Sequence, residues 1–185
     1  MAGATVSGMT SSGAAAFDFI HGTWAVHNRK RRDVTDPACD EWVEFDAASE
    51  AFPVLQGVGH LDRMTVPDPP DGPAFEGLTL RLFDPSDEAW RIWWSSSRAP
   101  GRVDPPLVGR FSDGLGVFEG EDVVAGRPIR LRFEWRADPS SPRWEQSFSY
   151  DGGVTWTVNW VMAFTRTGEA VGQGAPSAPL ATPQT

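Results

Sequence analysis

Apolar and polar residues alternate with a period of two through most of the chain between residues 17 and 166. This alternation is typical of β-strands that bury one face, because successive side chains point to opposite faces of a sheet. Short groups of Gly, Pro, Asp and Ser separate the alternating segments and predict turns. The pattern predicts about ten strands, in segments 22–31, 41–47, 52–56, 58–66, 75–83, 89–97, 108–111, 117–124, 129–136, 143–150 and 155–166.

Very little helix is expected, because no window of about 11 residues has an amphipathic helical period. One helical turn is predicted at Phe17 to Ile20, where Gly22 ends it. Consecutive strands joined by short turns predict an all-β fold, an antiparallel up-and-down barrel whose closure removes exposed edges. A β-sandwich is the alternative.

The parity of the last three strands predicts which side chains face inward. The apolar rows, expected to face inward, are Ile129, Leu131, Phe133 and Trp135; Trp144, Gln146, Phe148 and Tyr150; and Trp156, Val158, Trp160, Met162, Phe164 and Arg166. The opposite rows carry Arg and Glu, which we expect to face water and to pair across strands. The reverse arrangement, with a lumen lined by Arg and Glu, remains an alternative.

Indole side chains are the main candidates for the barrel interior. They either fill the lumen or form the wall of a cavity for a flat apolar ligand. The expected ligand-binding residues are Trp24, Trp94, Phe133, Trp135, Trp144, Gln146, Tyr150, Trp160 and Met162. Trp93 and Trp94 are adjacent and must face opposite ways, so the outward one could mark a homodimer face.

Several segments resemble a known family. Gly22-Thr23-Trp24 resembles the Gly-x-Trp that opens the first strand of lipocalins and other calycins. FDFIHGTW, LTLRLFDP, RWEQSFSYDGGVTW and NWVMAFTR resemble segments of a bacterial family of uncharacterised lipocalin-like domains. The resemblance covers residues 17–166 and implies a lipocalin-like barrel, but little about chemistry. It also implies that Arg166, from the final strand, lies within about 6 Å of the Trp24 ring.

Charge and cysteine content narrow the environment and the partners. Sixteen basic and 25 acidic residues give a net charge of −9, so neither nucleic acid nor an anionic membrane is an expected partner. Cys39 is the single cysteine, which excludes an internal disulfide and fits the cytoplasm. No apolar run is long enough to span a membrane as a helix. We expect a single domain over residues 17–167, with flexible tails at 1–16 and 168–185.

His60 and Asp62 are the candidate catalytic residues. They share one face of a strand, and a histidine beside a carboxylate can act as a general base. The alternative is a histidine that is merely hydrogen-bonded at the barrel rim. The three histidines, His21, His27 and His60, lack the spacing of a local metal site, so neither a metal nor another cofactor is expected. Haem stays open as an alternative, although no matching motif is present.

These features favour a protein that binds a small hydrophobic or aromatic molecule in the barrel lumen. The alternative is a cofactor-free cyclase or isomerase that acts on a hydrophobic secondary metabolite in the same cavity. A third reading is a protein–protein interaction module with a filled core.

Overall fold

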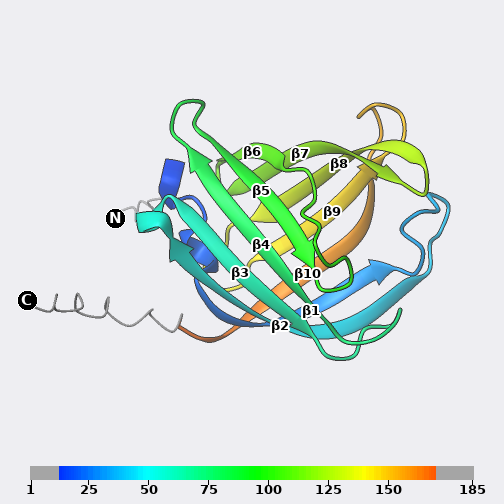
Figure 1. Cartoon of the computed structure of the whole chain (residues 1–185), viewed down its shortest axis with the longest axis horizontal. Coiled ribbons are helices and arrows are strands. Elements are labelled where there is room, and N and C mark those ends of the chain that lie inside the picture. Colours follow the sequence, from blue (N-terminus) through cyan, green and yellow to red (C-terminus); the bar gives the residue numbers. More distant parts are fainter. Residues whose placement is uncertain (1–12, 170–185) are drawn as a thin grey trace, which may run out of the picture.

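The chain folds into one closed barrel of ten antiparallel strands (Figure 1). The computed structural model describes residues 13–169. The strands are β1 (Gly22–Arg31), β2 (Trp42–Val54), β3 (Gly59–Val66), β4 (Phe75–Asp84), β5 (Ala89–Ser96), β6 (Leu107–Ser112), β7 (Leu115–Val124), β8 (Arg127–Arg136), β9 (Arg143–Ser149) and β10 (Thr157–Gly168). Each strand pairs with its neighbour in sequence, and β1 pairs with β10 to close the sheet. The predicted all-β barrel is therefore confirmed, and the sandwich is excluded.

Helices are few and short in the part of the chain that the structure describes. None of those helices is both long enough and apolar enough to cross a membrane.

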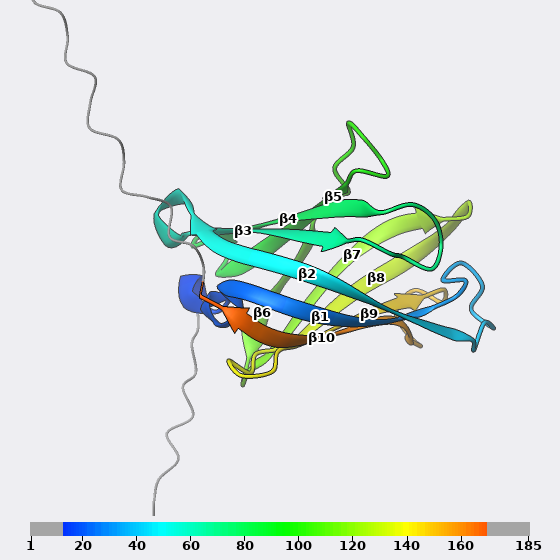
Figure 2. The ribbon, with the colours of Figure 1, turned by 90° about the horizontal axis from the view of Figure 1, so that it is seen from below.

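Two short 3-10 helices, η1 (Gly13–Ala15) and η2 (Asp18–Ile20), close one end of the barrel (Figures 1 and 2). We call residues 13–21 the plug. Phe17 is fully buried, and its ring lies 4.9 Å from the Phe111 ring and 5.1 Å from the Trp90 ring. Residues 13–16 were expected in a tail, but Ala16 is buried and Gly13 accepts a hydrogen bond from Trp90 Nε1. The rest of both expected tails lies almost entirely outside the described residues.

Arg166 joins the two strands that close the barrel and also holds the plug. Its Cζ lies 4.1 Å from the centre of the Trp24 ring, which confirms the predicted contact. Nη1 donates to the His21 carbonyl at 2.7 Å, and Nη2 donates to the Phe19 carbonyl at 3.2 Å. Gly22 is required here, because its φ is +126° and a Cβ would lie 2.4 Å from Arg166 Nη1.

Segment 52–56 was predicted as a separate strand, and this prediction is wrong. The second strand runs without interruption through Pro53 to Val54. A single turn of 3-10 helix, η3 (Leu55–Gly57), then leads into β3. The bend expected near Gly57 is therefore this turn.

A β-bulge in β10 changes which residues face the interior. Val158 pairs with Ser147 and Trp160 pairs with Gln146, so Asn159 is an extra residue in the strand. Beyond the bulge the apolar row faces inward as predicted. Before it the parity is reversed, and Trp156 lies outside, with Arg132 Cζ 3.8 Å from its ring centre. The prediction that Trp156 points into the lumen is wrong for this reason.

The outer faces of β7 and β8 carry the expected cross-strand ion pairs. Glu119 accepts hydrogen bonds from Arg130 at 2.9 Å and from Arg132 at 2.6 Å. The alternative of an Arg/Glu-lined lumen at these strands is therefore excluded.

The middle of the fourth strand reverses the usual distribution of apolar residues. Between Phe75 and Phe83, which pack against the core, its inward row carries Gly77, Thr79 and Arg81, all buried, whereas Leu78 on the outward row is 42% exposed. On β3, which pairs with β4, the inward row includes His60 and Asp62. Polar side chains thus enter the barrel from two adjacent strands.

Candidate functional site

The barrel contains a cavity of about 210 Å³. Its exposed lining residues, Asp104, Pro105 and Glu121, lie at the end of the barrel opposite the plug, so the cavity reaches solvent there. Its wall is formed by Ser49, Asp62, Met64, Thr79, Arg81, Ile92, Trp94, Asp104, Pro105, Leu107, Glu121, Asp122, Leu131, Phe133, Trp135, Trp144, Gln146, Phe148, Trp160, Met162 and Phe164. Aromatic side chains fill much of the barrel, but a pocket remains among them.

Seven of the nine predicted ligand-binding residues lie on this wall. They are Trp94, Phe133, Trp135, Trp144, Gln146, Trp160 and Met162. The indole of Trp160 is held by a hydrogen bond from its Nε1 to Asn28 Oδ1 at 3.0 Å. The wall is therefore both aromatic and fixed in orientation.

Trp24 and Tyr150 do not line the cavity. Trp24 is fully buried at the plugged end, where its Nε1 donates to the Ile20 carbonyl at 2.7 Å. The Tyr150 hydroxyl donates to the Val34 carbonyl at 3.3 Å, and Arg127 lies against its ring. Tyr150 follows β9 at the chain reversal before β10, which carries its side chain away from the lumen.

A buried ion pair lies on the cavity wall. Arg81 Nη2 lies 2.5 Å from Asp62 Oδ2, and both side chains are less than a tenth exposed. The guanidinium is also in contact with the plug and the wall, with its Cζ 4.9 Å from the Phe17 ring centre and 5.4 Å from that of Trp135. Arg81 therefore lies at the floor of the cavity, next to the plug.

The guanidinium of Arg81 is only partly satisfied. Its Nε and Nη1 are buried and have no hydrogen-bond partner among residues 13–169. Buried donors without partners are rare in folded proteins, and leaving one unpaired costs roughly 1–3 kcal/mol, or more for a charged group. A charged donor group at the floor of an aromatic pocket can hold the oxygen of a bound molecule.

Carboxylates surround the opening of the cavity. Asp104, Glu121 and Asp122 all contribute to the wall at this end. Burial raises the pKa of Asp104, and the nearby charge of Asp122 raises it further. The opening is therefore negatively charged and disfavours the entry of anions.

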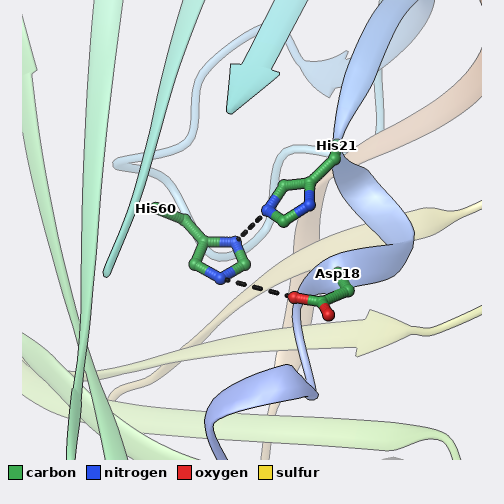
Figure 3. A group of neighbouring side chains, drawn as sticks. All are labelled: Asp18, His21 and His60. Carbon is green, nitrogen blue, oxygen red and sulfur yellow. Dashed lines mark hydrogen bonds and ion pairs between the residues drawn. The ribbon is translucent and has the colours of Figure 1, made fainter. Parts of the chain in front are cut away.

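His60 does not pair with Asp62, although both lie on the inward row of β3. Its Nδ1 lies 2.9 Å from Nε2 of His21, and its Nε2 lies 3.8 Å from Oδ1 of Asp18 (Figure 3). Arg81 holds Asp62 instead. The structure thus separates the two predicted catalytic residues: Asp62 lies on the cavity wall, and His60 lies among the plug residues.

Sequence spacing did not reveal the cluster of Asp18, His21 and His60. One ligand atom from each residue lies within 4.8 Å of the other two. His21 and His60 are 39 residues apart, and the plug and β3 bring them together only in the folded barrel. Local spacing of histidines carries no signal for such an arrangement.

Arg81 was also absent from the predicted site. Leu78, Leu80 and Leu82 alternate with it, so the hydrophobic pattern of β4 points Arg81 outward. The sequence did offer one signal for an inward Arg81. His60 and Asp62 on the neighbouring segment already indicated an inward row of polar residues, which an arginine could join.

The comparisons with known proteins show the fold alone. No protein-family model matches the chain, and no curated protein matches its sequence. The chain is similar to the crystal structure of Rv2717c from M. tuberculosis, with a TM-score of 0.57 and 12% sequence identity. The match covers 83% of this chain and 96% of Rv2717c. A related barrel architecture is therefore present in Rv2717c.

Proposed function

We propose that this protein binds a small, flat aromatic molecule in the barrel cavity, with an acceptor oxygen of the molecule placed on Arg81. The aromatic wall supplies apolar contact to both faces of a planar ligand. The observation that carries the proposal is the guanidinium of Arg81 at the cavity floor, whose Nε and Nη1 are buried without partners. A turn of the guanidinium toward the lumen would let an oxygen atom of the ligand satisfy these donors.

The charges favour a neutral acceptor over an anionic one. Asp62 already balances the charge of Arg81, so the floor carries no net charge. Asp104, Glu121 and Asp122 make the opening negative. A ketone, lactone or quinone carbonyl meets both conditions better than a free carboxylate does.

The second candidate function is a cofactor-free cyclase or isomerase that uses the same cavity. Asp62 favours it, because a buried carboxylate lies on the cavity wall next to a cationic donor that can polarise a carbonyl. In this arrangement Asp62 moves the proton and Arg81 orients the substrate. Mass spectrometry separates this candidate from simple binding. An enzyme converts the bound molecule into a rearranged product, whereas a binding protein releases it unchanged.

Three ligands of similar shape test the binding proposal: 2-acetylnaphthalene, 2-ethylnaphthalene and 2-naphthoate. Saturable quenching of tryptophan fluorescence reports their binding. The acetyl compound should bind about tenfold more tightly than the ethyl compound, since only its carbonyl accepts a hydrogen bond from a charged donor. The carboxylate should bind no more tightly than the acetyl compound.

The key variant is the double substitution Arg81→Met/Asp62→Asn, which removes both charges and leaves neither one buried alone. It should bind the acetyl and ethyl compounds equally. The matched control is Arg63→Met/Glu50→Gln, which removes an ion pair of 3.7 Å between β3 and β2, where the Arg63 side chain is exposed and that of Glu50 is partly exposed. This control should keep the preference. Equal binding of both compounds by the wild-type protein, or no saturable binding of either, contradicts the proposal.

We also propose that the barrel is of the calycin type, that the protein is cytoplasmic and that its ligand belongs to secondary metabolism. Support comes from Gly22 and Trp24 opening the first strand and from Arg166 lying across Trp24. A single free cysteine, Cys39, is in keeping with a reducing compartment.

A further inference from the structure

His60 carries a buried nitrogen that the protein itself does not satisfy. The side chain is fully buried, with the Trp90 ring 5.0 Å away in an edge-on arrangement. Its Nε2 has no hydrogen-bond partner among the described residues. This nitrogen lies nearest to the carboxylate of Asp18, on the plug (Figure 3).

The distance between His60 and Asp18 fits a bridging ion better than direct contact. At 3.8 Å, Nε2 and Oδ1 are too far apart for a hydrogen bond. Two ligands that each lie about 2.0–2.2 Å from one tetrahedral zinc ion are separated by about 3.3–3.6 Å, so a shift of a few tenths of an ångström would let Nε2 and Oδ1 share an ion. His21 lies within the same 4.8 Å group and completes a set of two imidazoles and one carboxylate. This set of ligand types is one that zinc and similar transition-metal ions bind with a position left open for water.

An ion can reach this group from solvent, and its charge can be balanced there. The Asp18 side chain is 58% exposed, so the cluster opens to water on the plug side. Arg81 lies close, but Asp62 compensates its charge. Asp18 itself supplies a negative charge next to the buried nitrogen.

We propose that Asp18, His21 and His60 bind a divalent transition-metal ion, with zinc as the type ion. The ion binds Nε2 of His60, the nitrogen without a partner, and His21 turns away from Nδ1 of His60 to reach the ion. Asp18 and His21 belong to the plug and His60 belongs to β3, so the metal fastens the plug to the barrel wall. This site is distinct from the cavity, whose lining does not include any of the three residues.

The test is a titration of the full-length, chelator-treated protein with Zn²⁺, measured by isothermal titration calorimetry. The wild-type protein should bind one equivalent, and Asp18→Asn and His21→Gln should each weaken binding by at least about tenfold. Both substituted side chains are solvent-accessible, so these variants should fold. The same titration with Co²⁺ should give visible d–d absorption bands in the wild-type protein and not in the two variants.

The matched control is His27→Gln. His27 also contacts two carboxylates, with Nδ1 3.0 Å from Asp46 and Nε2 3.6 Å from Glu44, but it is half exposed on the outer face of β1. This variant should bind zinc as the wild-type protein does. No binding by the wild-type protein overturns the proposal. Binding that Asp18→Asn and His21→Gln leave unchanged also overturns it, because the ion then lies elsewhere.

Discussion

At the scale of single residues, the barrel keeps ionisable groups in its interior that a structural core does not require. Arg81 and Asp62 pair with each other on the cavity wall. His60 is held as a neutral base near the plug, because burial lowers its pKa to about 3. Both arrangements reduce stability relative to an apolar core of the same shape, and a binding role for these side chains accounts for their presence.

His60 should make the protein less stable as the pH falls below 6.5. The unfolded chain takes up a proton near pH 6.5, but the native protein does so only near pH 3. The native state therefore loses stability between these values, by about 1.4 kcal/mol per pH unit at most. Urea unfolding of the chelator-treated wild-type protein at pH 6 and at pH 5 should show a loss of about 1 kcal/mol from this residue.

The variant His60→Gln should lose less stability between pH 6 and pH 5 than the wild-type protein, whatever its starting stability. Equal pH dependence in wild-type and His60→Gln proteins would show that His60 titrates normally in the folded state.

At the scale of elements, the plug and the closing strands depend on one another. Arg166 on β10 contacts the Trp24 ring on β1 and donates to two carbonyls of the plug. Gly77 on β4 has a comparable role in the cavity wall, because it leaves room for the indole of Trp94 on β5. Both residues allow one element to lie close to another.

The substitution Arg166→Met should destabilise the protein by roughly 2 kcal/mol, since it removes charged hydrogen bonds and a cation–π contact together. The stability of Arg166→Lys should lie between those of the wild-type protein and Arg166→Met. A lysine keeps the positive charge but cannot donate two hydrogen bonds with the geometry of a guanidinium. Chemical unfolding measures both changes. Amide hydrogen exchange in η2 should accelerate in Arg166→Met, and unchanged exchange would argue against a link between β10 and the plug.

The substitution Gly77→Ala should reduce the cavity. A Cβ at this position would lie 1.9 Å from Cη2 of Trp94, so the indole must move toward the lumen. The affinity for 2-acetylnaphthalene should then fall by roughly tenfold, as expected for overpacking. Gly120→Ala is the control, because its Cβ would meet no atom closer than 3.4 Å. Equal affinities of the two variants would place the ligand away from Trp94.

At the scale of the whole molecule, a closed barrel with a net charge of −9 is kept apart from its copies by repulsion at neutral pH. This repulsion vanishes near the isoelectric point of about 4.7. The same pH lies within the range where His60 lowers the stability of the native state.

Light scattering should therefore rise steeply as the pH falls from 6 toward 4.7, because loss of charge and loss of stability coincide. Between pH 6 and pH 4.7 the light scattering of His60→Gln should rise less than that of the wild-type protein. This variant loses its net charge over that range but does not lose the stability that protonation of His60 removes. A clear solution of the wild-type protein at pH 4.7 would contradict this expectation.

The sequence predicted the architecture well, because strand periodicity and turn residues are local signals. Residues 22–31 of the first strand were predicted with the bounds that the structure shows. The contact between Arg166 and Trp24 followed from strand parity and family resemblance. Trp156 was misplaced, since a bulge at Asn159 inserts one residue and reverses the parity before it.

The polar part of the site was less accessible from sequence. Arg81 alternates with leucines along β4. The hydrophobic pattern of the strand therefore predicts that the leucines face inward and that Arg81 faces outward. The group of Asp18, His21 and His60 depends on how the plug folds back onto β3. Patterns within a strand do not contain this information.

The pairing of β1 with β10 has a consequence for how the protein is made. Trp24 and Arg166 are neighbours in the sheet but stand at opposite ends of the domain sequence. During synthesis the hairpins from β1 onward can form as they leave the ribosome, whereas the pairing of β1 with β10 can form only after β10 has emerged. Contacts between such distant residues slow folding. Until then, the nascent chain carries two open strand edges, which neighbouring chains can pair with.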